Sequence, residues 1–135
     1  MEATAPNREP RHRRLKVLVI DDYRDGAEAF AHLVQEMGHQ TAFATTGDSA
    51  LEFAERMQPE VIFLDLVLPD IEGHELARLL RRLPGLQATR IYVVSAYGTD
   101  EDRRRSREAG CDGHYVKPLE TAFVETLLGN LPRSR

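Results

Sequence analysis

The sequence has a single cysteine and lacks any long apolar run, and these absences narrow the class of protein. Cys111 stands alone and cannot form a disulfide within the chain. No stretch approaches the roughly 20 apolar residues that a membrane-spanning helix needs. None combines a basic start, an apolar run and a small-residue cleavage site. The sequence therefore predicts a soluble, cytoplasmic protein without a membrane partner.

A strong charge of one sign is also missing, since the formal net charge is only −4. Basic residues crowd the start of the chain and recur in the segment Arg103–Arg107. Either cluster could contact nucleic acid. The first belongs to a polar tail, however, and the second to a charged helix face interleaved with acids. We therefore predict no direct nucleic-acid partner.

The 135 residues are enough for one domain that buries a sizeable core. Residues 1–14 contain two prolines, many charges and no apolar periodicity, which predicts a disordered lead-in. We expect the folded domain to cover residues 15–129 and a short tail to cover residues 130–135. So few residues follow the domain that any output is expected to pass through a partner surface or through a part of the protein outside this sequence.

Short apolar runs alternate with segments of helical periodicity along this domain. We expect strands at residues 15–20, 40–45, 61–65, 90–95 and 113–116, and helices at residues 25–37, 47–58, 72–83, 100–109 and 120–128. Gly38 is expected to end the first helix in a left-handed conformation. The weakly alternating run at 40–45 is expected at a sheet edge. Five such alternations predict an α/β fold with a doubly wound parallel sheet.

The apolar run at residues 61–69 contains one carboxylate, Asp65. Burying an unpaired carboxylate is costly, so Asp65 is expected where the strand leaves the core, at its C-terminal end. Ligands bind at this edge of an open parallel sheet. Asp21 and Asp22 follow the first strand, while Ser95 and Lys117 end two others. We expect these side chains to converge.

Three neighbouring carboxylates repel one another unless a cation neutralises them, and oxygen ligands suit Mg²⁺. An Asp side chain can form an acyl-phosphate, and a metal beside the phosphoryl group offsets its charge. We therefore predict Asp65 as a nucleophile, with the Lys117 ammonium and the Ser95 hydroxyl on phosphoryl oxygens. Taken singly, Asp21 or Asp22 could simply cap the next helix. The prediction depends on the joint occurrence.

From about Leu15 to Leu128 the chain resembles a response-regulator receiver domain of two-component signalling. The shared features are the acidic pair, the central aspartate with Leu68, Pro69 and Gly73, the Ser95–Ala96 pair, and the Lys117–Pro118 pair. The resemblance implies a flavodoxin-like fold with strand order 2-1-3-4-5. It also implies phosphorylation of Asp65 by a histidine kinase or histidine phosphotransfer protein.

The same resemblance implies that Mg²⁺ is held by Asp22, Asp65 and the main-chain carbonyl of Val67, with Asp21 acting through water. Ser95 and Lys117 occupy the positions of the family's conserved hydroxyl and lysine. The departure is His114, which stands where many receivers have an aromatic switch residue.

Ser95 and His114 are the predicted switch pair, although His114 could also be a partly exposed strand residue. Tyr115 points to the opposite face of its strand and cannot replace His114. The resemblance also implies that Tyr97, two residues past Ser95, influences access to the phosphorylated site. With a histidine at position 114, the chain is similar to the receivers of hybrid sensor kinases. Both a stand-alone receiver and a receiver of the hybrid-kinase type are therefore possible.

Two other functions compete with a receiver that only phosphorylates and dephosphorylates itself and is no enzyme toward a separate substrate. An aspartate-nucleophile phosphatase would need a second Asp two residues after Asp65, where Val67 stands. A binding module that works without phosphorylation would have no reason to keep three repelling carboxylates together. The output partner is not predicted.

Overall fold

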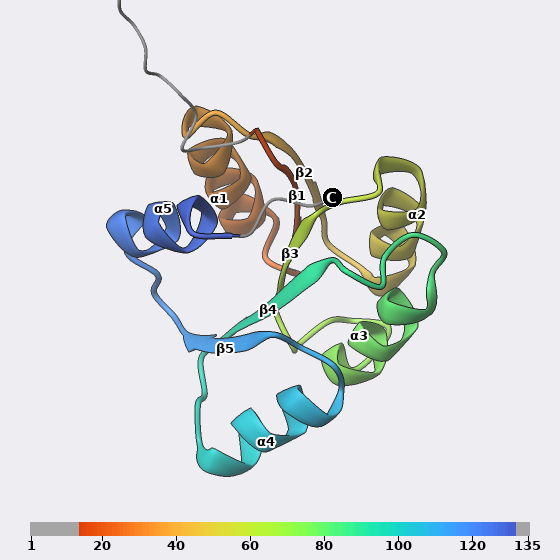
Figure 1. Cartoon of the computed structure of the whole chain (residues 1–135). Coiled ribbons are helices and arrows are strands. Elements are labelled where there is room, and N and C mark those ends of the chain that lie inside the picture. Colours follow the sequence, from red (N-terminus) through yellow and green to blue (C-terminus); the bar gives the residue numbers. More distant parts are fainter. Residues whose placement is uncertain (1–13, 132–135) are drawn as a thin grey trace, which may run out of the picture.

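The computed structural model describes residues 14–131, and its centre is a parallel sheet (Figure 1). The strands are β1 (Lys16–Ile20), β2 (Gln40–Ala44), β3 (Val61–Leu64), β4 (Arg90–Ser95) and β5 (Gly113–Val116). They pair in the order β2-β1-β3-β4-β5, and every pairing is parallel. The predicted fold class and strand order are confirmed, with β2 at a sheet edge as expected.

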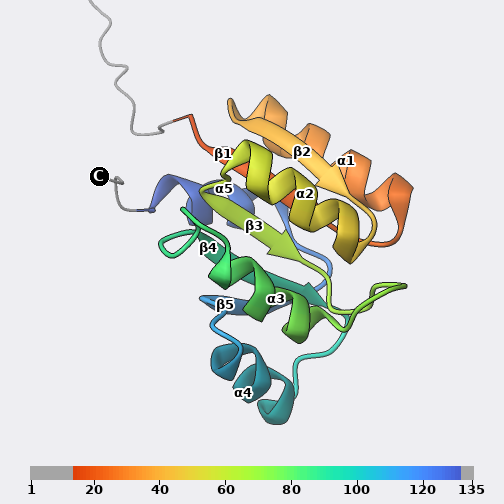
Figure 2. The ribbon, with the colours of Figure 1, turned by 90° about the vertical axis from the view of Figure 1, so that its right-hand side faces the viewer.

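Helices cover both faces of the sheet. They are α1 (Arg24–Glu36), α2 (Gly47–Met57), α3 (Gly73–Arg82), α4 (Asp100–Glu108) and α5 (Thr121–Gly129). Figures 1 and 2 show α1 and α5 on one side and α2 and α3 on the other. Gly38 has a φ of 103°, as predicted for the residue that ends the first helix. Apart from Arg14, the predicted N-terminal tail lies outside the described residues, as do residues 132–135.

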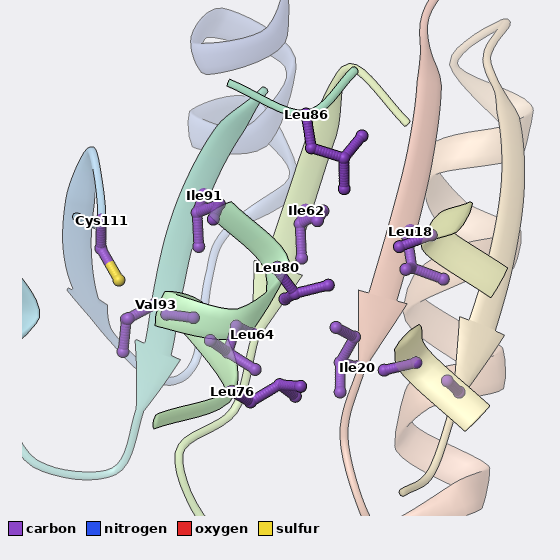
Figure 3. Packing of buried hydrophobic residues seen from close by; sticks show 14 of the residues in the cluster. Leu18, Ile20, Ile62, Leu64, Leu76, Leu80, Leu86, Ile91, Val93 and Cys111 are labelled. Carbon is purple, nitrogen blue, oxygen red and sulfur yellow. The ribbon is translucent and has the colours of Figure 1, made fainter. Parts of the chain in front are cut away.

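The strands read as continuous apolar runs because both faces of the sheet are buried. On the α2 and α3 side, Leu18 and Ile62 pack with Leu76 and Leu80 of α3 (Figure 3). Within residues 14–131, the helices are all too short or too polar to cross a bilayer.

On the α1 and α5 side, a row of aromatic rings crosses the sheet from Phe30 through Phe63, Tyr92 and Tyr115 to Phe123. Successive ring centroids lie 5.0, 5.9, 5.9 and 5.0 Å apart. The row joins α1, the three strands β3, β4 and β5, and α5, so it fixes how these elements sit together. Tyr115 belongs to this face, whereas its neighbour His114 points to the opposite face of β5, because successive side chains of a strand alternate between the two faces.

Asp70 connects the loop after β3 to the start of α2. Its Oδ1 accepts a hydrogen bond from the Gly47 amide at 2.8 Å, and its Oδ2 accepts one from the Asp48 amide at 3.0 Å. These amides belong to the first turn of α2 and have no partner within the helix. The bond to the Gly47 amide, followed by that to Asp48, lowers the pKa of Asp70. Asp70 therefore fixes the loop that follows Asp65.

Replacing Asp70 with asparagine is expected to lower the urea midpoint of unfolding at neutral pH, because an amide offers a single oxygen to the two N–H groups. A carboxylate with a lowered folded-state pKa stabilises the fold above its unfolded value of about 3.9, and this contribution is lost as the pH falls through the folded value. The difference in urea midpoint between wild type and Asp70→Asn should therefore become smaller in acid.

Glu52→Gln, an exposed change within the same helix, is the control and should show no comparable gap. A gap of constant size from neutral pH into acid would contradict the role given to the Asp70 carboxylate.

Candidate functional site

The side chains at the ends of β1, β3 and β5 meet as the sequence predicts. Asp65 directly follows β3, and its Oδ2 lies 3.0 Å from the Nζ of Lys117. The same ammonium lies 3.2 Å from the Oδ2 of Asp21. One lysine from the end of β5 thus contacts carboxylates from two other strands, because the carboxyl ends of parallel strands share one edge.

Both oxygens of Asp65 are bound within the protein. Oδ1 accepts a hydrogen bond from the Val67 amide at 3.1 Å, while Oδ2 faces Lys117. Its side chain is only 12% exposed. Burial raises the pKa of Asp65 above its ordinary value, although the Val67 amide and the Lys117 ammonium oppose the rise. A cation beside this group would favour its ionised form.

Lys117 keeps its charge at this position. Burial by itself lowers the pKa of the ammonium, but the contacts with Asp65 and Asp21 outweigh it, so the pKa of Lys117 is raised. The main chain holds the residue as well, since the Lys117 amide donates to the Ser95 carbonyl at 2.8 Å. Its charged end is thereby directed at the carboxylates.

The acidic cluster fits a small divalent cation. Asp21, Asp22 and Asp65 each offer one carboxylate oxygen, and these oxygens lie within 4.8 Å of one another. Opposite ligands of Mg²⁺ stand about 4.2 Å apart, so small side-chain shifts would enclose the ion. Asp22 is exposed at the rim. Val67, whose carbonyl is the further expected ligand, adjoins the cluster because its amide N–H donates a hydrogen bond to Asp65 Oδ1.

Ser95 lies at the end of β4, but its hydroxyl serves its own turn. The side chain is buried, and its Oγ accepts a hydrogen bond from the Tyr97 amide at 3.1 Å. The structure thus places Ser95 at the predicted edge while its hydroxyl binds the loop between β4 and α4. The Tyr97 side chain is exposed.

His114 is buried, with 6% exposed, so the interpretation of a partly exposed strand residue is wrong. Its Nε2 lies 2.8 Å from the Tyr97 carbonyl oxygen, and its Nδ1 lies 2.8 Å from the Oγ of Ser106. The sequence reasoning missed Ser106, which is the one buried residue of α4. The signal was present, since Ser106 interrupts a segment in which its neighbours are almost all charged.

A pocket of about 290 Å³ opens beside the carboxylates. Its lining includes the charged residues Asp21, Asp65 and Lys117 and apolar residues such as Phe30 and Leu119. A reacting group could reach Asp65 from this pocket. A wider groove of about 930 Å³ lies along β2 between α1 and α2, away from these side chains.

Comparison with known proteins identifies this arrangement. A family model for the response regulator receiver domain matches residues 17–128. The chain belongs to this family. Receiver domains are signalling modules of two-component response regulators rather than conventional enzymes, and they bind Mg²⁺ at an acidic pocket. They interact with kinases or phosphotransfer proteins and with output partners.

The receiver is similar to proteins of known role and structure. The polar-differentiation response regulator DivK of Brucella ovis is 28% identical over 112 residues, which are 82% of this chain and 91% of that protein. The chemotaxis protein CheY4 of Vibrio cholerae superposes with a TM-score of 0.81 at 25% identity, covering 86% of this receiver and 97% of that chain.

A response regulator of Burkholderia pseudomallei was solved with a phosphorylated aspartic acid, a calcium ion and citrate. It gives a TM-score of 0.77 at 27% identity and covers 84% of this receiver and 66% of that chain.

Proposed function

We propose that this receiver accepts a phosphoryl group on Asp65 from a histidine kinase or a histidine phosphotransfer protein and thereby changes a partner-binding surface. The observation that carries the proposal is the Lys117 ammonium shared by Asp65 and Asp21, with the Asp22 carboxylate beside them. The phosphorylated aspartic acid of the Burkholderia relative supports it. We place the reaction in the cytoplasm, with an output partner that recognises the phosphorylated form and without membrane or nucleic-acid contact.

Asp65 is the nucleophile in this proposal. A carboxylate oxygen forms a bond to phosphorus while the bond between phosphorus and the donor's imidazole nitrogen breaks, and that nitrogen leaves with the electron pair. Asp65 accepts a main-chain N–H and the Lys117 ammonium while lining the pocket, as Asp21 also does. These two donors fix the orientation of the attacking group. Asp65 is the nucleophile because it is the single carboxylate after the central strand β3, between the ends of β1 and β4.

Mg²⁺ would be held by Asp21, Asp22, Asp65 and the Val67 carbonyl, with Asp21 acting through water. When bound it offsets charge on the phosphoryl oxygens. Lys117 supplies a second positive charge at the same place, because its Nζ already lies at the Asp65 carboxylate. Ser95 would release the Tyr97 amide and turn its hydroxyl toward a phosphoryl oxygen, which draws the loop after β4 inward.

We propose no turnover of a separate substrate. An aspartate-nucleophile phosphatase would place an acid two residues after the nucleophile, and Val67 has no proton to give there. Self-catalysed phosphorylation and dephosphorylation fit the residues present.

The test is incubation with a small phosphodonor and Mg²⁺, followed by intact-mass measurement and mapping of the modified peptide. One phosphoryl group per chain, located on Asp65, is the expected result. Modification of Asp21 or Asp22 in place of Asp65 would overturn the assignment. Steady release of phosphate from an unrelated phosphomonoester would favour the phosphatase.

Replacing Asp22 with asparagine is expected to weaken Mg²⁺ binding at least about tenfold, since even outer-shell partners of a metal are worth about 10–100-fold in affinity. Removing a charge from the cluster also relieves repulsion, so the metal-free variant should unfold at a higher urea concentration than wild type. A Mg²⁺ titration followed by the amide resonances of Val67 and Gly26 measures the affinity.

Asp25→Asn, an exposed change in the first turn of α1, is the control. Equal affinities for wild type and Asp22→Asn would remove Asp22 from the metal site.

A further inference from the structure

A second polar cluster lies away from the carboxylates, in the layer between the sheet and α4. Glu72 Oε2 lies 3.0 Å from His74 Nδ1, and His74 Nε2 lies 2.9 Å from Ser106 Oγ. Ser106 Oγ lies 2.8 Å from His114 Nδ1, and His114 Nε2 lies 2.8 Å from the Tyr97 carbonyl. The three middle side chains are 1%, 2% and 6% exposed. This chain of contacts joins α3, α4, β5 and the loop after β4.

This chain of contacts has one proton too few to form all four of its hydrogen bonds. A carboxylate and a carbonyl stand at its two ends, and both only accept hydrogen bonds. Four hydrogen bonds therefore need four protons from the middle residues. Neutral His74, Ser106 and neutral His114 supply one each. In the neutral chain, one pair of atoms must face each other as two acceptors.

The neutral set of contacts has four arrangements, one for each contact that can be left without a proton. In the first, His114 donates to the Tyr97 carbonyl, Ser106 donates to His114, and His74 donates to Ser106. The unprotonated Nδ1 of His74 then faces the Glu72 carboxylate. In the other three, His74 donates to Glu72, and these are favoured because hydrogen bonds to a charged acceptor are the stronger ones. Among the three, the contact between His114 and the Tyr97 carbonyl is the one left without a proton at least cost, since it is partly exposed while the two contacts of Ser106 are buried.

One added proton removes the conflict. A doubly protonated His74 donates to both Glu72 and Ser106, which leaves Ser106 free to donate to His114 and His114 to the Tyr97 carbonyl. Burial lowers the pKa of His74 from its ordinary value of 6.5, Glu72 opposes this change, and Arg105 and His114 add to it. The proton therefore binds below neutral pH.

The surrounding charges come from every element packed on the chain. Around His74 these are Glu72 and Arg105, whose side chains lie 3.7 Å apart. Around His114 they are Asp102 and Arg103 of α4, and Arg103 donates to the His114 carbonyl at 2.8 Å. Asp112 is paired with Arg81 at 3.0 Å, and burial raises the pKa of the Cys111 thiol to about 12, which keeps it neutral.

We propose that the contacts from Glu72 to Tyr97 form a proton-dependent link, in which proton uptake fixes the loop after β4 to β5 and proton loss releases the Tyr97 carbonyl. The link is independent of phosphoryl transfer, because it uses none of the carboxylates of the acidic cluster. It makes His74, Ser106 and His114 positioning residues for the loop that begins directly after Ser95.

The test is a pH titration of the full chain between about pH 8 and about pH 5, observed by NMR. Imidazole nitrogen spectra report which ring nitrogens of His74 and His114 are protonated. The Gly98 amide reports the Tyr97 carbonyl, since the two share a peptide bond. We expect His74 to become doubly protonated below pH 6.5, the single proton of neutral His114 to move from Nδ1 to Nε2, and the Gly98 amide to shift with the midpoint of His74.

His74→Gln should abolish the titration of the Gly98 amide, because glutamine does not titrate. Ser106→Ala should leave His74 titrating while the Gly98 amide no longer follows it. His32→Gln removes an exposed histidine that pairs with Glu36, and it should leave the Gly98 titration unchanged.

A Gly98 amide that does not shift in wild type, or that titrates equally in His74→Gln, would overturn the proposal. The wild-type titration is decisive by itself if either buried variant fails to fold, because the proposal requires equal midpoints for His74 and Gly98.

Discussion

Replacing Asp65 with asparagine is expected to abolish phosphoryl incorporation from a small phosphodonor in the presence of Mg²⁺. An amide oxygen is a poor nucleophile, and the variant also loses a negative charge from the metal site. Asp21 accepts a comparable pair of donors, the Tyr23 amide and the Lys117 ammonium. We do not expect it to substitute, because it follows β1, one strand further than Asp65 from the Ser95 hydroxyl at the end of β4. Intact-mass measurement of wild type and variant under the same conditions gives the result.

Loss of labelling in Asp65→Asn should not come from unfolding. The pKa of Asp65 is raised in the folded state, so the ionised carboxylate costs stability, and this cost appears as the pH rises through the window above its ordinary value. At neutral pH the variant should therefore unfold at the same urea concentration as wild type or a higher one. Continued labelling of a folded Asp65→Asn would transfer the nucleophile role to another residue.

Replacing Phe63 with alanine is expected to cost about 3–5 kcal/mol of unfolding free energy, as deletion of a buried aromatic ring typically does. Phe63 is 2% exposed on the central strand β3 and contacts the rings of Phe30 and Tyr92. Such a loss is a large part of the 5–15 kcal/mol by which domains are usually stable, on the order of half. Urea unfolding followed by circular dichroism measures it.

Phe123 gives the matched control, because it ends the same aromatic row but is 39% exposed. Phe123→Ala removes the same ring from a site that solvent already reaches, so its cost should be clearly the smaller of the two. Equal costs would mean that the row is not anchored at β3.

The sequence predicted the fold and the positions of the carboxylates because both follow from local patterns. Apolar runs of strand length fixed the strands, and the rule that parallel strands end at one edge brought Asp21, Asp65 and Lys117 together. Helix ends differed by a residue or so; α1, for example, begins at Arg24 rather than Asp25. Such ends depend on capping contacts that periodicity does not encode.

Contacts between elements distant in sequence were not predictable. Asp70 binds amides 23 and 22 residues away, and nothing in its turn sequence indicates this. His74, Ser106 and His114 come from three elements, and each appears ordinary within its own segment. Burial of His114 follows from the packing of α4 on β5, which the charged sequence of α4 does not suggest. The sequence around His114 was therefore also compatible with an exposed strand residue.

The position of Lys117 has a consequence for the resting receiver under the proposed mechanism. Its ammonium pairs with the Oδ2 atoms of both Asp21 and Asp65, so it competes with Mg²⁺ for these carboxylates. Bound Mg²⁺ would weaken the ion pairs of Lys117, and these ion pairs would lower the affinity for Mg²⁺ by the same free energy. A phosphoryl group ends the competition, because it gives the ammonium an anionic partner of its own and leaves the aspartate oxygens to the ion.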